Sequence, residues 1–124
     1  MLTLSSEQLQ REIQAAALKA IELFRKDFPN VEVCGFALYS DADARSLAPA
    51  FNTKDHLARV QAENPEDRLY FKWSPAEWSH EAFGGHYFAD LSKTLWSMAD
   101  ATSRDHFEQH RRQVFEICVA AMQT

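Results

Sequence analysis

The stretch VEVCGFALY, residues 31–39, decides the fold because it has the pattern of a β-strand that is apolar on both sides. Successive side chains of a strand point to opposite faces, so every second residue shares a face. One face would carry Val31, Val33, Ala37 and Tyr39, and the other Cys34, Phe36 and Leu38. Apolar residues on both faces are typical of a strand that is covered twice. We therefore expect a central strand here, with Cys34 buried in it.

A long helix is predicted before this strand. Ser5 and Gln8 have the spacing of a capping box, which places the first helical residue near Ser6. Pro29 disfavours helical backbone at Phe28 and so ends the helix. Apolar residues at helical spacing predict its buried side, namely Leu9, Ile13, Ala16, Ala17, Ala20 and Phe24.

Two further strands are predicted after residue 39. The segment Ser46–Phe51 can return antiparallel to the first strand, but Pro49 has no backbone N–H and confines the segment to a sheet edge. A short helix over about residues 53–61 follows it. Arg68–Trp73 alternates between polar and apolar residues, which predicts a half-buried strand with Trp73 pointing into the core.

The sequence directly after Arg68–Trp73 has the pattern of a helix start. Ser74 suits the N-cap, Pro75 the first helical position, and Glu77 the third. Trp73 and Trp78 then occupy the two positions that pack together as a hydrophobic staple. We interpret this stretch as a structural joint between a strand and a helix.

Two C-terminal helices complete the predicted fold. One is expected over about residues 86–98, and apolar residues from Phe107 to Met122 at helical spacing predict another. Few strands joined by short turns, with helices at both ends, favour an α+β class over a doubly wound parallel sheet. We expect a single α+β domain over residues 1–124. Its small, mainly antiparallel sheet of two or three strands would be covered by the N-terminal helix and the C-terminal helices.

Charge limits the choice of partner. The formal net charge is −5 and the isoelectric point about 5.5, so a nonspecific grip on nucleic acid phosphates is disfavoured. The sequence contains no stretch that predicts a membrane span and no secretory leader, so we expect a cytosolic protein. The clearest local excess of acidic residues is a candidate binding surface for a basic partner, and it comprises Asp41, Asp43, Asp55, Glu63, Glu66 and Asp67.

Candidate chemistry is sparse. With three glycines in the chain, the Gly-rich motif of a dinucleotide site is missing, and no nucleophile motif is present. His80, Glu81 and His86 are an alternative site, because histidines beside a carboxylate and a Gly-Gly break can serve as a metal site or a general base. Tyr70 and Trp78 are the aromatic residues expected to be partly exposed, as anchors for a partner. The sequence indicates no catalytic residue, no metal and no cofactor, and it leaves the oligomeric state open.

Three motifs carry a resemblance to a known family. FALYSD (36–41), SLAPAFNT (46–53) and YFKWSPAEW (70–78) occur in an order that resembles a bacterial family of domains of unknown function, domain of unknown function 4303, over about residues 33–80. The resemblance implies a compact α+β domain and supplies no catalytic residues.

We therefore expect a noncatalytic bacterial protein that binds another protein through an acidic surface. Small acidic domains of this kind are similar in size and charge to immunity proteins, so a basic toxin domain is the expected partner. The alternative is a small enzyme or a metal- or ligand-binding domain that uses His80, Glu81 and His86.

Overall fold

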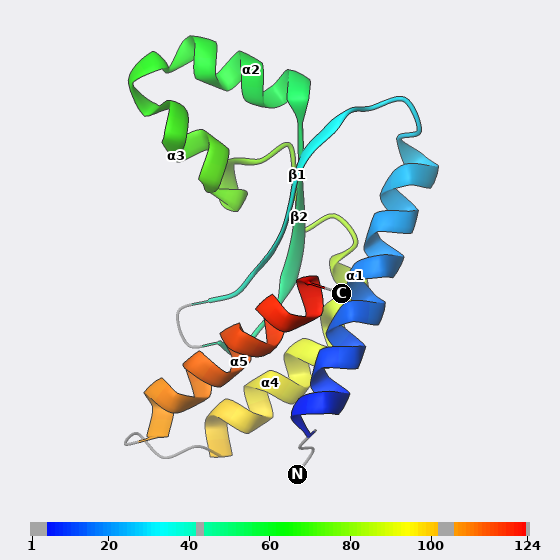
Figure 1. Cartoon of the computed structure of the whole chain (residues 1–124), viewed down its shortest axis with the longest axis vertical. Helices are drawn as coiled ribbons and strands as arrows, with labels where there is room; N and C mark the ends of the chain where they lie inside the picture. The colour runs from blue at the N-terminus through cyan, green and yellow to red at the C-terminus, as the bar shows by residue number, and fades with distance from the viewer. Residues whose placement is uncertain (1–4, 42–43, 102–105, 124) are drawn as a thin grey trace.

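The computed structural model describes residues 5–41, 44–101 and 106–123, and it has the predicted α+β class. Within these residues five α-helices accompany a three-stranded antiparallel sheet (Figure 1). The helices are α1 (Ser6–Asp27), α2 (Lys54–Glu63), α3 (Arg68–Trp73), α4 (Ala89–Ala101) and α5 (Phe107–Met122), and the strands are β1 (Val33–Tyr39), β2 (Ala48–Thr53) and β3 (His80–Glu81). Three short 3-10 helices are η1 (Pro65–Asp67), η2 (Pro75–Glu77) and η3 (Gly85–Phe88).

The N-terminal helix forms as predicted. The Ser5 side chain accepts a hydrogen bond from the backbone N–H of Gln8, and the Gln8 side chain accepts one from the backbone N–H of Ser5, which completes the capping box. The helix ends at Asp27, directly before Phe28 and Pro29. Its six predicted apolar residues are all buried, and the helix packs mainly against α5 and also against α4.

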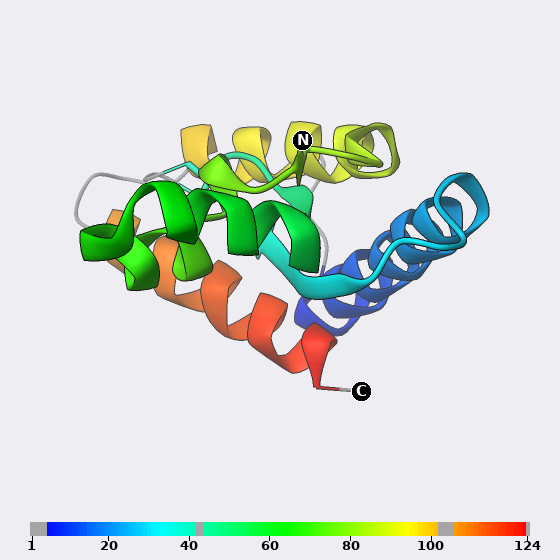
Figure 2. The same ribbon diagram turned by 90° about the horizontal axis from the view of Figure 1, so that it is seen from above.

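Helices and sheet lie together around one main core. In Figure 1, α4 and α5 lie at the lower end of the sheet and α1 runs beside it, and Figure 2 shows the three helices from above. Phe51 of β2 stacks on Phe24 of α1, with ring centroids 4.5 Å apart, and Phe36 of β1 lies against Phe51 at 4.9 Å. Phe88 and Leu95 are fully buried on the C-terminal side of the same core.

The order of the strands corrects two predictions. The sheet runs β1-β2-β3, so β1 is an edge strand and β2 is the central one, although the sequence predicted the reverse. Pro49 is tolerated in β2 because β3 pairs only with Ala50 and Phe51, so no partner strand faces Pro49 on that side. The predicted burial of Cys34 is also wrong, since its side chain is exposed on the edge strand.

The segment Arg68–Trp73 is a helix, α3, and the strand predicted there is wrong. Six residues are too few for alternation to separate a strand from about one and a half turns of helix. Pro65 opens η1 directly before this segment, and a proline at a first helical position favours helical backbone after it. Trp73 consequently lies in solvent, with 69% of its surface exposed, instead of in the core.

The predicted helix start at Ser74 is only partly present. Pro75 begins a helix, but this is the three-residue 3-10 helix η2, and within the described residues the Ser74 side chain caps nothing. Trp78 follows η2 in extended backbone, so it does not reach the helical position that a staple with Trp73 requires. The strand that pairs with β2 comes immediately afterwards, at His80 and Glu81.

Candidate functional site

An arm made of α2, η1, α3 and η2 projects from the end of the sheet that is remote from α4 and α5 (Figure 1). Across these four elements no side chain is fully buried. The two helices pack on each other, and α2 and η2 connect the arm to the rest of the chain through their contacts with β2. A segment with no core of its own leaves its outer side chains available for contact.

One side of α3 carries three large, exposed apolar side chains, which we call the apolar face of α3. Leu69 is 72% exposed, Trp73 69% and Tyr70 54%. Leu69 and Trp73 are four residues apart and so lie on the same side of the helix. The Lys72 ammonium lies 5.1 Å from the centre of the Trp73 ring, which adds a positive charge next to this surface.

Trp78 fixes the arm to the sheet. Its ring lies over Gly35 of β1, where there is no side chain to prevent the approach, and its Nε1–H donates to the Phe71 carbonyl at 3.2 Å. Within the arm, the Nε2 of His56 in α2 lies 3.0 Å from the Glu77 carbonyl oxygen in η2, which ties these two elements together. The predicted anchor Trp78 is thus half-buried and holds the arm, whereas the predicted anchor Tyr70 is exposed.

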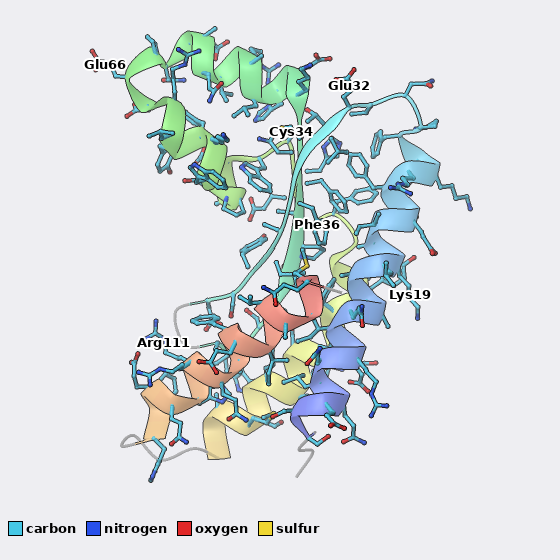
Figure 3. All side chains as sticks on the ribbon, viewed as in Figure 1. Lys19, Glu32, Cys34, Phe36, Glu66 and Arg111 are labelled. Carbon is cyan, nitrogen blue, oxygen red and sulfur yellow. The ribbon has the colours of Figure 1, made fainter. Side chains whose placement is uncertain are left out.

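The structure separates the six predicted acidic residues into distinct places. Glu63, Glu66 and Asp67 are exposed together at the turn between α2 and α3, which we call the acidic tip, and Figure 3 shows Glu66 at the outer end of the arm. Asp55 lies in the first turn of α2, at the other end of that helix. Asp43 lies outside the described residues.

Asp41 lies at the far end of β1 and has a structural role. Its Oδ1 accepts hydrogen bonds from the Arg45 backbone N–H at 2.7 Å and from the Ser46 and Ser40 hydroxyls at 3.3 and 3.2 Å. Partial burial would raise the pKa of this carboxyl, but these hydrogen bonds outweigh burial and lower it. Asp41 therefore closes the turn after β1 and is not part of the acidic tip.

The residues of the predicted alternative site, His80, Glu81 and His86, have different neighbours. The His80 ring lies among phenylalanines, with centroids 5.0 Å from Phe24 and 4.8 Å from Phe28, and the Ser79 hydroxyl is 2.8 Å from its Nδ1. Burial, and then the positive charge of His56, lowers the pKa of His80.

Glu81 and His86 make their contacts elsewhere. Glu81 accepts a hydrogen bond of 2.8 Å from the Tyr39 hydroxyl. Burial and then this hydrogen bond raise the pKa of Tyr39 to about 12. His86 is exposed, and its ring lies on Tyr87 at 4.1 Å. Over the described part of the chain, no group of three or more His, Cys, Asp or Glu side chains is placed to hold a metal ion.

The apolar face of α3 was missed by the sequence prediction. The alternation of Arg68–Trp73 predicts a strand, which places Trp73 in the core and not on an exposed helix. The spacing of four residues between Leu69 and Trp73 was the available signal, since it places both on one side of a helix. The Pro65 that precedes them was a second signal, because proline is favoured at helix starts.

A family model covers nearly the whole chain. The family is described as a domain of unknown function, DUF4303, and its model matches residues 13–124. The chain belongs to this family, and the match extends well beyond the three motifs that first suggested it. No curated protein and no solved structure matches the chain. None of the described helices is long and apolar enough to cross a membrane.

Proposed function

We propose that this chain, which belongs to a family with no assigned function, is a noncatalytic protein-binding domain of the bacterial cytosol. Its partner is a basic protein, such as a toxin domain that it neutralises. The observation that supports this proposal is the apolar face of α3, where Leu69, Tyr70 and Trp73 lie exposed on an arm without a buried side chain.

Exposure of these three side chains favours a protein partner over a small molecule. Trp and Tyr are the residues most enriched among the few that carry most of the binding energy at protein interfaces. Full burial of an apolar side chain of this size is worth roughly 1.5–3 kcal/mol, so three of them form a sufficient apolar centre. They project from a helix with more than half of each side chain exposed, so they suit insertion into a partner's pocket.

The acidic tip supports a basic partner. Glu63, Glu66 and Asp67 precede the apolar face of α3 directly in the chain, and the whole chain carries a net charge of −5. Exposed charges at the rim of an interface mainly raise the rate of association with a partner of opposite charge. The tip would therefore steer the partner, and the apolar face would hold it.

The test compares two matched double variants as bait. Leu69→Ala with Trp73→Ala removes the apolar face, and Leu18→Ala with Trp96→Ala removes the same residue types from exposed positions on α1 and α4. A protein retained by the wild type and by the second variant, but lost from the first, is purified and titrated calorimetrically. We expect the first variant to weaken binding at least about 30-fold, as loss of central interface residues does.

A second variant tests the charge. Glu66→Lys with Asp67→Lys should slow association and reduce its dependence on salt, while dissociation changes little. The proposal is wrong if the purified partner binds the variant that lacks Leu69 and Trp73 as tightly as the wild type. It is also wrong if the retained partner is acidic and the lysine substitutions leave its association rate unchanged.

A further inference from the structure

β1 has a free edge. Six of its seven residues pair with β2 on one side, and on the other side no hydrogen bond joins its backbone to any other described segment. The edge is also accessible, since Val33 is 45% exposed and Cys34 is exposed. Unpaired backbone donors and acceptors along an edge can be satisfied by another extended strand.

β1 lacks the features with which proteins usually protect an edge strand. Its sequence, VCGFALY, contains no charged residue and no proline. A register irregularity between Val33 and Gly35 is the one protective feature, and Phe36–Tyr39 pairs regularly with β2 beyond it. An exposed edge strand of this composition promotes aggregation unless another segment pairs with it.

We propose that a second copy of this chain pairs with the free edge, so that the β1 strands of the two copies lie antiparallel about a two-fold axis. The charge of the edge is compatible with a copy. Each chain carries −5, but β1 is uncharged along its whole length, so pairing two copies of β1 brings no like charges into contact along the strand.

The two ends of β1 are also compatible. An antiparallel two-fold brings the start of one β1 beside the end of the other. At the start, the Glu32 carboxylate is 3.5 Å from the Lys54 ammonium, and Figure 3 shows Glu32 at this end of the strand. Asp41 of the second copy, just past the end of its β1, thus meets a neutralised pair and not a single like charge.

The side chains match in the same arrangement. Residues directly opposite each other in an antiparallel pair point to the same face of the sheet. Phe36 and Leu38, which are half-buried on the core side, would lie beside Phe36 and Leu38 of the copy. On the opposite face, Gly35 and Ala37 have little or no side chain of their own, and the Trp78 ring lies over Gly35. Pairing would therefore bury the remaining exposed surface of Phe36 and Leu38.

The interface is separate from the proposed partner surface. β1 supplies the former and the apolar face of α3 the latter, so each can fail without the other. Loss of Leu69 and Trp73 should leave the dimer intact, and loss of the dimer should leave partner binding through α3 measurable.

The experiment measures the mass of the purified chain in solution by sedimentation over a range of concentrations. We expect a dimer that dissociates on dilution. Val33→Glu with Cys34→Glu places charge on the edge at two positions already exposed, and should raise the dimer dissociation constant at least about tenfold. Leu18→Glu on α1 and Val119→Glu on α5, at positions 54% and 56% exposed, are the matched controls and should leave the dimer unchanged.

Three outcomes would overturn the proposal. A wild type that is monomeric at every concentration excludes the dimer. A dimer that survives the glutamates on β1, or one that Val119→Glu dissociates, places the contact elsewhere. Aggregates that grow without limit, in place of a dimer, would exclude a two-fold symmetric arrangement. If the double variant does not fold, hydrogen exchange on the wild type decides instead, because β1 amides must exchange faster on dilution if a second strand protects them.

Discussion

At the scale of single residues, His80 shows how a candidate catalytic group can be a packing group. Its ring lies edge-on to Phe24, Phe28 and Phe83, with the Ser79 hydroxyl at its Nδ1. Burial, and then the charge of His56, lowers the pKa of His80 from its ordinary value of 6.5. The aromatic surroundings favour the neutral ring, as they would for a structural residue.

This lowered pKa makes stability depend on pH. Below pH 6.5 the unfolded chain takes up a proton that the folded chain resists, so the unfolded state binds more protons and the free energy of unfolding falls as the pH falls. The loss is complete once the pH is below the folded pKa. We expect His80→Phe to flatten the fall in melting temperature between pH 6.5 and the folded pKa, measured calorimetrically.

Phe83→Leu is the control for this measurement. It removes packing from the same cluster without removing a titrating group, so it should lower the melting temperature at every pH by a similar amount. If the melting temperature of His80→Phe falls as steeply with falling pH as that of the wild type, then His80 does not cause the pH dependence.

At the scale of elements, the two predicted helix starts differ in their hydrogen bonds. Ser5 has both bonds of a capping box, whereas Ser74 has no capping bond in the described structure. We expect Ser5→Ala to lower the free energy of unfolding by about 1 kcal/mol. Ser74→Ala should change it by less than about 0.5 kcal/mol. Urea unfolding of the two variants measures the difference, and equal losses would contradict the structural distinction.

The same contrast shows how much the sequence could predict. The helix α1 was predicted correctly because its cap, its apolar stripe and its terminal proline all lie in the segment or within two residues of its ends. The state of Arg68–Trp73 depends on α2 and on Trp78, which pack against it from elsewhere in the chain. Local alternation could not contain that information, so the strand prediction failed, and the apolar face of α3 was missed with it.

At the scale of the whole molecule, the chain consists of a packed body and an arm. The body buries its apolar residues between α1, α4, α5 and the sheet, and the arm has no fully buried side chain. Regions with few buried apolar contacts open with less free energy than the global unfolding. Amides of α2 and α3 should therefore exchange by local opening, while those of α1 exchange only by global unfolding.

Gly35→Ala tests what holds the arm to the body. A Cβ at residue 35 would lie 3.0 Å from the Trp78 ring, which is also held at Phe71, so the ring must shift. We expect faster hydrogen exchange in α2 and α3 and a loss of stability of about 1–3 kcal/mol, the usual cost of overpacking. Gly85→Ala is the matched control, because nothing lies within 4 Å of a Cβ there, and it should leave exchange in the arm unchanged. If Gly35→Ala leaves the arm protected to the same degree, then the contact of Trp78 with β1 is not what fixes the arm, and the contacts of α2 and η2 with β2 would have to carry the attachment.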